Sequence, residues 1–279
     1  MRSERLFKYH GLGNDFFVLD RRDGTPDLDP DAVRWLCDRR RGLGADGILS
    51  LLPSELGAAR MVVHNADGSI AEMCGNGLRC AVKYLVDRGE RSTTLTIDTG
   101  AGPLVCEVGA RQGDSHEIAI EMGPARLTHP GVLPEQTPFV QRAIPGHPEV
   151  LGTAVSMGNP HLVLLETGPE RAAALGPLLE RHPLFPSRTN VEFVTRTEEG
   201  LEVVVWERGC GFTQACGTGA CASVAALVHL GRLEADVWHR VKLPGGPLSI
   251  RVSADLSRVR MQGPATFVFE AVVTLPTAH

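Results

Sequence analysis

The sequence lacks several features that would assign a protein to a class at once. No apolar run approaches the length of a membrane-spanning helix, and residues 1–16 lack the apolar core of a secretory signal. The net charge is −5, and we interpret the one basic run, Arg39 to Arg41, as a solvated helix end. We therefore expect a cytoplasmic protein that binds neither membrane nor nucleic acid.

The usual cysteine patterns are absent as well. None of the seven cysteines lies in a C-x-x-C pair, and the C-x5-C spacings at 74/80 and 210/216 fit no structural zinc site. No H-x3–5-H motif accompanies them, and a chain of 279 residues does not need disulfides to complete its core. We expect reduced thiols, no metal, and inert thiols at positions 37, 80, 106, 210 and 221.

The length of 279 residues favours two domains over one. A Gly/Pro-rich stretch from Pro124 to Pro134 marks the boundary, so we expect domains at residues 1–124 and 125–266. The apolar run TFVFEAVVTL follows a Gly263-Pro264 break. We expect residues 267–279 to return to the first domain as a strand.

The two halves resemble an internal repeat. Cys216 follows Cys74 by 142 residues, Glu207 follows Asn65 by 142, and Asn159 follows Asn14 by 145. Helix-like segments at 30–41 and 169–181 also match, as do GLGADGILSL and PSRTNVEFVT, which pair Asp46 roughly with Asn190. A duplication is therefore indicated.

Alternating apolar and polar residues predict half-buried strands at 116–122, 201–207 and 257–262. Residues 216–230 are small or apolar nearly all round, which predicts a helix enclosed by sheet, and residues 74–88 are its counterpart. The pattern indicates an α+β protein dominated by antiparallel sheet.

A Cys-Gly-x-Gly signature opens both helix-like segments, at Cys74-Gly75-Asn76-Gly77 and Cys216-Gly217-Thr218-Gly219. A helix start presents unpaired N–H groups and a positive dipole end, which lower a thiol pKa and bind a carboxylate. Two such thiols suit a reaction that removes a proton from one face of a carbon and returns one to the other face.

Two other interpretations of these thiols remain open. His161 and Asn159 offer a base and an orienting amide for a cysteine nucleophile, although one thiol would then be unexplained. A disulfide between Cys74 and Cys216 is a third possibility, and it fits oxidative inactivation better than function.

Further polar residues gather in short turn motifs, where binding groups often lie. Taken singly, most are typical of ordinary turns, and a lone histidine such as His161 is more often structural than catalytic. Arg208 follows a strand just ahead of the second cysteine turn, where it can clamp a carboxylate, and Glu207 beside it can hold an ammonium group.

The motifs GLGNDF, HNADGS, EMCGNGLRC, MGNPH, TNVEF, WERGCGFTQACGTGACA and LPGGPLSI resemble the diaminopimelate epimerase family in order and spacing over nearly the whole chain. The resemblance implies two pseudo-symmetric domains, each a curved sheet around a central helix, with the site in the cleft between them. It implies a cofactor-independent isomerase that interconverts LL- and meso-diaminopimelate in lysine and peptidoglycan precursor biosynthesis, as a homodimer.

Residue by residue, the resemblance implies that Cys74 takes the α-proton of the LL isomer and Cys216 delivers one to the opposite face. His161 and Glu207 would support the reacting amine. The remaining residues are implied to bind substrate, the first four through N–H groups at the reacting carboxylate and the others at the distal end: Gly75, Asn76, Gly217, Thr218, Asn14, Asn65, Asn159, Asn190 and Arg208.

Two positions depart from the family pattern. Gly47 stands where many members place a substrate-contacting Gln, which leaves that contact to water or backbone. Phe269 stands where some have a Tyr at the dimer contact, which removes a hydroxyl and keeps the ring.

Two other functions fit the same sequence features. Proline and hydroxyproline racemases share the fold and the two-cysteine logic, but their ring substrates would leave Arg208 and the asparagines without a role. A non-catalytic binding module of the same fold is the other rival, because a fold alone does not fix function.

Overall fold

The computed structural model describes residues 3–128, 137–165 and 169–275. The chain divides into two compact units, Met1–Ile120 with Gly263–His279, and Glu121–Gln262. Residues 129–134 of the boundary stretch expected from the sequence lie outside the described residues. The mixture of sheet and helix confirms the α+β class.

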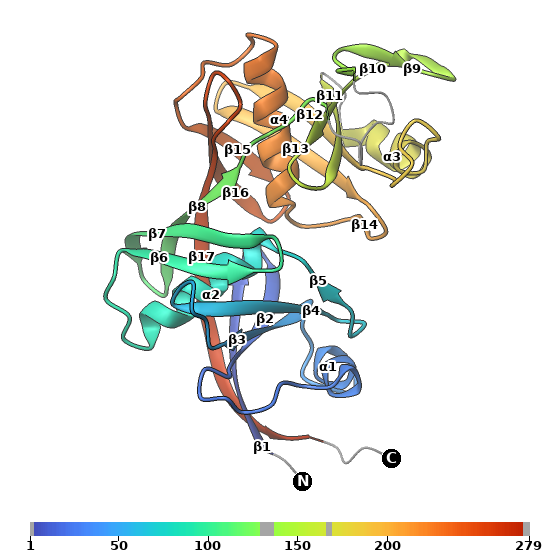
Figure 1. Cartoon of the computed structure of the whole chain (residues 1–279). Helices are drawn as coiled ribbons and strands as arrows, with labels where there is room; N and C mark the ends of the chain where they lie inside the picture. The colour runs from blue at the N-terminus through green and yellow to red at the C-terminus, as the bar shows by residue number, and fades with distance from the viewer. Residues whose placement is uncertain (1–2, 129–136, 166–168, 276–279) are drawn as a thin grey trace. The chain divides into compact units, whose positions relative to one another are not determined.

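The first unit begins with two strands, and each of its two helices is followed by three strands (Figure 1). Its elements are β1 (Ser3–Gly11), β2 (Asn14–Asp20), α1 (Pro30–Cys37), β3 (Gly47–Leu52), β4 (Ala59–Asn65), β5 (Ile70–Ala71), α2 (Gly75–Asp87), β6 (Thr94–Thr99), β7 (Gly102–Gln112) and β8 (Ser115–Gly123).

The second unit repeats that order after a short extra strand. Its elements are β9 (Arg142–Ile144), β10 (His147–Ser156), β11 (Pro160–Leu165), a 3-10 turn (Pro169–Arg171), α3 (Ala172–Glu180), β12 (Asn190–Thr197), β13 (Gly200–Glu207), β14 (Gly211–Phe212), α4 (Gly217–His229), β15 (His239–Leu243), β16 (Gly246–Val252) and β17 (Val259–Thr274).

Strand pairing confirms the internal repeat. β1 and β2 are antiparallel, β2 and β3 parallel, β3 and β4 antiparallel, and β4 and β6 parallel. β10, β11, β12, β13 and β15 follow the same sequence of pairings. Antiparallel pairs dominate, as the alternating pattern predicts.

The ladders correct one equivalence. Phe16 of β2 pairs with Gly47, and His161 of β11 pairs with Asn190 in the same way. Phe16 lies two residues after Asn14, and His161 lies two residues after Asn159, so Phe16 and His161 are equivalent. Asn190 is therefore equivalent to Gly47, one residue beyond the Asp46 expected from the sequence.

Each unit has a central helix, as predicted. Helix α2 packs against β1, β2, β3, β4 and β7, and α4 packs against β10, β11, β12, β13 and β16 (Figure 1). Buried residues run without interruption from Asn76 to Leu85 in α2 and from Gly219 to Val228 in α4. Nearly the whole circumference of each helix is therefore covered.

The helix predicted at 30–41 ends early. Asp29 caps its start, accepting from the Ala32 N–H, and the last helical residue is Cys37. The Asp38 carboxylate then accepts the N–H groups of Arg40 and Arg41, at 2.8 and 3.0 Å, and so competes with helix continuation. The basic run follows a turn, and its first member, Arg39, donates hydrogen bonds to Asp15 and Asp46.

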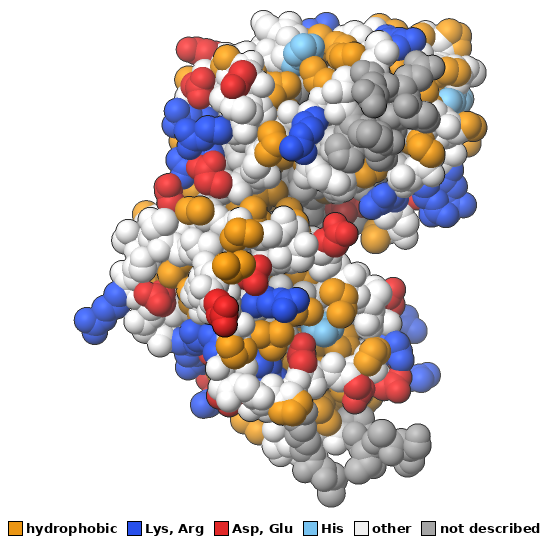
Figure 2. Space-filling model, viewed as in Figure 1, with side chains coloured by type: hydrophobic (Ala, Val, Ile, Leu, Met, Phe, Trp, Pro, Cys, Tyr) orange, Lys and Arg blue, Asp and Glu red, His pale blue; other side chains and the backbone are white. Residues whose placement is uncertain are grey.

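The C-terminal strand joins the first unit. β17 pairs with β16 through residues 259–262, and its later part pairs with β1 from Thr266 to Thr274. On the face shown in Figure 2, acidic and basic side chains are interspersed over both units. Within the described residues, no helix has the length and apolar character needed to cross a membrane.

Candidate active site

Cys74 and Cys216 occupy the same local position in their two units. Each is the N-cap residue of a central helix with an extended backbone, at φ −141° and ψ 114° for Cys74 and φ −112° and ψ 104° for Cys216. The Cys74 sulfur accepts the N–H of Gly77, and the Cys216 sulfur accepts the N–H of Gly219, both at 3.4 Å. The repeated signature therefore encodes a thiol cap on the first helical turn.

Glycine is needed where each helix begins. A Cβ added at Gly77 would lie 2.9 Å from the Leu49 side chain, and one at Gly219 would lie 2.9 Å from the Glu192 carboxylate. Either helix start therefore lies closely against the neighbouring strand.

Amides surround Cys74 in the first unit. The Asn14 oxygen lies 3.9 Å from the Cys74 sulfur and accepts the Asn76 side-chain amide at 3.1 Å. Arg79, which is fully buried, donates to the Asn76 oxygen at 2.8 Å. The structure thus brings Cys74, Asn14 and Asn76 together.

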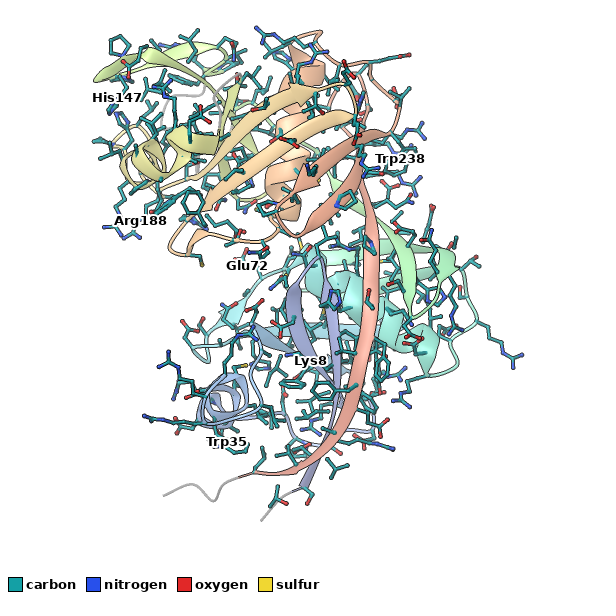
Figure 3. The ribbon with its side chains drawn as sticks, turned by 180° about the vertical axis from the view of Figure 1, so that it is seen from behind. Lys8, Trp35, Glu72, His147, Arg188 and Trp238 are labelled. Atoms are coloured by element: carbon teal, nitrogen blue, oxygen red, sulfur yellow. The ribbon has the colours of Figure 1, made fainter. Side chains whose placement is uncertain are left out.

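A charged network fixes Asn14 from behind. Its amide donates to Asp46 at 2.8 Å, and Arg39 bridges Asp46 and Asp15. Lys8, which Figure 3 labels on β1, also pairs with Asp15. Hydrogen bonds from Arg39 and Lys8 hold the pKa of Asp15 below its ordinary value, against the effect of burial. The orientation of Asn14 is therefore set by ion pairs.

Cys216 is the more buried thiol of the two. Burial, followed by the charges of Glu207 and Glu192, raises the pKa of Cys216 well above its ordinary value, and hydrogen bonds from Thr218 and Gly219 only partly oppose this. The expectation that a helix start lowers the pKa of both thiols is therefore wrong for Cys216. Removal from water outweighs the helix dipole here.

His161 forms a fully buried pair beside Cys216. Its Nδ1 lies 2.6 Å from Glu192 Oε1, its Nε2 lies 2.9 Å from Asn159 Oδ1, and neither the histidine nor the glutamate side chain is exposed. Asn159 in turn donates to the Thr218 hydroxyl at 3.3 Å. His161, Asn159, Thr218 and Cys216 are thus linked within one unit.

Glu207 is positioned at the end of β13. The Thr213 hydroxyl donates to it, and burial raises its pKa against the hydrogen bonds from Thr213 and Cys216. A carboxyl group held in this way next to a thiol fits the predicted supporting role at a substrate amine.

Arg208 and Asn190 form a second group. Asn190 donates to the Pro160 oxygen and accepts the backbone N–H of Arg208, both at 2.9 Å, so it holds the turn that carries Arg208. The exposed Arg208 guanidinium donates to the Ser187 carbonyl at 3.0 Å. The polar atoms of Asn190 are engaged within the protein, which makes it a support for Arg208.

The same turn is held by a buried carboxylate. Glu180 accepts the Trp206 indole N–H at 3.1 Å and the Gly209 N–H at 3.0 Å. Arg188, labelled in Figure 3 between α3 and β12, lies 3.7 Å from Glu180. The turn after β13 is therefore fixed from both sides.

The side-chain hydrogen bond of Asn65 is made within its own turn. It is exposed at the end of β4, and its amide donates to Ser69 within the same turn at 2.9 Å. Gly75 and Gly217 are the first residues of α2 and α4, where backbone N–H groups have no partner within the helix.

Both departures from the family pattern have a structural context. At Gly47, an added Cβ would lie 2.5 Å from the His64 carbonyl oxygen, so any side chain at this position would clash with the neighbouring strand. Phe269 is partly exposed on β17, and its ring packs edge-on against Phe17 with centroids 6.2 Å apart.

Four of the remaining cysteines are buried and one, Cys210, is exposed. Burial raises the pKa of Cys37 to about 11 and that of Cys106 to about 12, which favours the unreactive thiol. Among the described residues, no group of three or more His, Cys, Asp or Glu side chains is arranged to hold a metal ion.

Sequence reasoning missed Glu192, Asp46, Glu180 and Thr213. Asp46 and Glu192 stand in the quoted motifs GLGADGILSL and TNVEF, but their motif positions alone gave them no role. Glu180 stands at the end of a predicted helix, where it reads as solvent-facing. Only the packing shows that Glu192 and Glu180 are buried.

The comparisons with known proteins agree with each other. The family model described as diaminopimelate epimerase matches residues 6–128 and 153–268. Diaminopimelate epimerase of Desulfitobacterium hafniense (strain DSM 10664 / DCB-2) is 44% identical over 283 residues, which cover 96% of this chain and 97% of that protein.

Solved structures extend the likeness to more distant proteins. A Bacillus anthracis phenazine biosynthesis protein of the PhzF family matches with a TM-score of 0.74 at 16% identity, covering 99% of this chain and 100% of that one. A hydroxyproline epimerase from Agrobacterium vitis matches with a TM-score of 0.66 at 18% identity, covering 98% of this chain and 91% of that one. At such low identity, the two likenesses show the fold alone.

Proposed function

The chain belongs to the diaminopimelate epimerase family, and we propose that it interconverts LL- and meso-diaminopimelate by two-base proton transfer at the α-carbon. The reaction serves lysine and peptidoglycan precursor biosynthesis and uses no cofactor such as pyridoxal phosphate. The observation that carries the proposal is the duplicated thiol cap, in which each sulfur accepts a helix N–H at 3.4 Å.

Cys74 removes the α-proton of the LL isomer as a thiolate, and Cys216 delivers a proton to the opposite face as a thiol. The raised pKa of Cys216 supports the second role, because it favours the protonated sulfur at neutral pH. One C–H bond breaks and one forms, and the two sulfurs exchange protonation states. In the reverse direction, Cys216 is the base.

The N–H groups that begin α2 and α4 bind the reacting carboxylate. They come from Gly75 and Asn76 in one unit and from Gly217 and Thr218 in the other. Aligned peptide dipoles at a helix start favour negative charge there by about 0.3–1 kcal/mol or more. Such stabilisation matters most when deprotonation moves charge into the carboxylate.

The polar side chains divide between the two ends of the substrate. Glu207 and His161 support the reacting amine, and the partly buried carboxylate of Glu207 suits an ammonium group. Arg208 binds the distal carboxylate, with its turn held by Asn190 and Glu180. Asn14, Asn65 and Asn159 complete the distal contacts.

Single replacements test the two-thiol mechanism. Cys74→Ala and Cys216→Ala should each abolish epimerisation in a folded protein, with loss of the thiol cap costing about 0.5–2 kcal/mol of stability. Cys210→Ala is the matched control, because Cys210 is exposed and outside the proposed site, and it should keep full activity. In deuterium oxide, wild-type turnover should place deuterium at the substrate α-position. Full epimerisation by either alanine variant at 74 or 216 contradicts the proposal.

Substrate choice is tested by assaying diaminopimelate, proline and hydroxyproline side by side. We expect turnover of diaminopimelate alone, since a ring substrate leaves Arg208 without a partner. Equal or faster turnover of either imino acid would identify a racemase. Rapid alkylation of Cys74 that diaminopimelate blocks would exclude a non-catalytic module, with Cys210 read separately as the exposed reference thiol.

We also propose a cytoplasmic homodimer formed through β17. Its outer end exposes Val268, Phe269 and Val272, of which Val272 is 71% exposed. An exposed apolar cluster of this kind is typical of an interface. Light scattering should give twice the monomer mass, and Val272→Asp should shift it to the monomer; an unchanged dimer would place the interface elsewhere.

A further inference from the structure

Glu192, which pairs with His161 inside the second unit, takes no part in the proposed proton transfer. His161 and Glu192 join at 2.6 Å with both side chains fully buried. Glu192 Oε2 has no hydrogen-bond partner among the described residues, and burial raises the pKa of Glu192 despite His161. A proton shared between the two groups avoids an isolated buried charge.

The repeat shows that the fold does not require this pair. Phe16 and Gly47 pair in the first unit as His161 and Asn190 pair in the second, so Leu49 is the counterpart of Glu192. The contacts of the two helix starts agree with this equivalence. A Cβ added at Gly77 would lie 2.9 Å from Leu49, and one added at Gly219 would lie 2.9 Å from Glu192.

The same helix start thus packs on a leucine in one unit and on a glutamate in the other. Buried ion pairs rarely stabilise a protein more than apolar residues of similar size. The polar pair therefore calls for a reason other than stability.

The hydrogen bonds from this pair run in one direction toward Cys216. His161 Nε2 faces Asn159 Oδ1 at 2.9 Å, so this nitrogen carries a hydrogen and donates. Asn159 Nδ2 donates to the Thr218 oxygen at 3.3 Å. Since that oxygen is already an acceptor, its own hydrogen is available to the Cys216 sulfur, 3.6 Å away.

The two thiols have different polar neighbours. The Asn14 oxygen lies 3.9 Å from the Cys74 sulfur and also accepts the Asn76 amide. The Thr218 hydroxyl lies 3.6 Å from the Cys216 sulfur. Because a hydroxyl donor favours a thiolate, Thr218 can hold Cys216 once it has lost its proton.

We propose that Glu192 is a positioning residue that shares one proton with His161, fixes hydrogen on Nε2, and thereby directs Asn159 and Thr218 to donate toward Cys216. This rests on the proposed function, in which Cys216 alternates between thiol and thiolate. No proton travels along the chain. When Cys216 gives its proton to the α-carbon, the Thr218 hydroxyl and the Gly219 N–H hold the resulting thiolate.

The charges that face Cys216 make this support necessary. Glu207 from β13 and Glu192 from β12 both disfavour a thiolate, and His161 on β11 offsets Glu192 through the shared proton. The Thr218 hydroxyl and the Gly219 N–H favour the thiolate. Loss of one hydrogen bond to a charged group changes such an equilibrium by about 10- to 100-fold.

The test measures the alkylation rate of Cys216 by iodoacetamide between pH 6 and 10 on the full chain, by mass spectrometry of its peptide. Glu192→Leu copies the first unit and frees Nδ1, so Asn159 and Thr218 lose their fixed direction. We expect alkylation at least about tenfold slower at pH 8. Glu192→Gln can still donate to Nδ1, and we expect its rate to stay within about threefold of wild type.

Thr218→Val removes the last donor and should slow alkylation as much as Glu192→Leu does. In the double variant, the two effects should not add, because both cut one chain. Cys210 in the same digest serves as the internal reference, with an unchanged rate. kcat for diaminopimelate should fall in parallel, with KM changed less than about threefold.

Several results would overturn the proposal: wild-type alkylation of a folded Glu192→Leu variant, equal slowing by Gln and Leu, additive effects with Thr218→Val, or a wild-type Cys216 that resists the reagent at every pH. If Glu192→Leu does not fold, Thr218→Val and Glu192→Gln decide alone. Alkylation involves no substrate, so a chain that reacts as expected but leaves diaminopimelate unchanged would refute the proposed function and leave this inference standing.

Discussion

Alanine replacement of Gly77 and of Gly219 should destabilise the protein by different amounts, because the two helix starts have different neighbours. Gly77 and Gly219 both donate N–H to a cysteine sulfur, and neither has a positive φ, so alanine fits either backbone. Their new neighbours differ. A Cβ at 77 meets a Leu49 methyl at 2.9 Å, whereas one at 219 meets the Glu192 carboxylate at 2.9 Å and the Cys216 sulfur at 3.3 Å.

The expected changes in the free energy of unfolding follow from the cost of moving each neighbour. Gly→Ala in a helix gains up to about 1 kcal/mol, and moving one leucine methyl in a packed core costs about 1–3 kcal/mol. Gly77→Ala should therefore destabilise by about 0–2 kcal/mol. Shifting Glu192 breaks a buried pair with His161, which costs about 3–5 kcal/mol. Gly219→Ala should therefore destabilise by about 2–4 kcal/mol.

Urea unfolding of both variants and the wild type measures the difference. A double-mutant cycle adds the decisive comparison, because in a Glu192→Ala background the carboxylate is gone and Gly219→Ala should cost about 1 kcal/mol or less. The reasoning is refuted if Gly77→Ala proves the more damaging change. It is also refuted if Gly219→Ala costs the same in both backgrounds.

Three further outcomes are expected. Because the folded-state pKa of Glu192 is raised, its stabilising contribution is complete below about pH 4.5 and declines as pH rises, by at most about 1.4 kcal/mol per pH unit. Urea midpoints of Glu192→Gln should lack that decline, and parallel pH profiles would contradict it. Arg208→Lys, which loses the Ser187 contact, should raise KM for diaminopimelate about 10- to 100-fold with an unchanged melting temperature, and an unchanged KM would remove Arg208 from the site. Gly47→Gln, despite matching the family pattern, should destabilise by about 1–3 kcal/mol against the His64 carbonyl, and an unchanged urea midpoint would contradict the close approach.

The elements with strong local signals were predictable. Two glycine-flanked cysteines followed by small apolar residues indicated both central helices, and the structure begins them at Gly75 and Gly217. The helix at 30–41 was overextended, because the Asp38 carboxylate binds the next two N–H groups and ends it. Such a choice depends on side-chain geometry that residue spacing does not contain.

Candidate site residues could be named from the sequence, but their surroundings could not be predicted. Glu192 alternates with apolar neighbours in its strand, which reads as a solvent-facing position. β12 instead has both α3 and α4 packed against it, so a polar position is buried. The predicted lowering of the Cys216 pKa was wrong for the same reason. A helix start is a local feature of the sequence, whereas desolvation depends on the whole fold.

The repeat separates what the cap motif imposes from what its surroundings add. Both sulfurs accept an N–H at 3.4 Å, so the motif alone makes the two thiols equivalent. A two-base exchange needs them unequal, one charged and one protonated, at the start of each turnover. The inequality has to come from residues that differ between the two units: Thr218 at the variable position of the motif, with its hydroxyl 3.6 Å from the Cys216 sulfur, and the buried carboxyl groups around Cys216. Burial, and after it the charges of Glu207 and Glu192, raises the pKa of Cys216 and so favours its protonated form, whereas the hydrogen bonds from Thr218 and Gly219 favour the thiolate. We therefore propose that the divergence of the duplicated units makes the two thiols unequal.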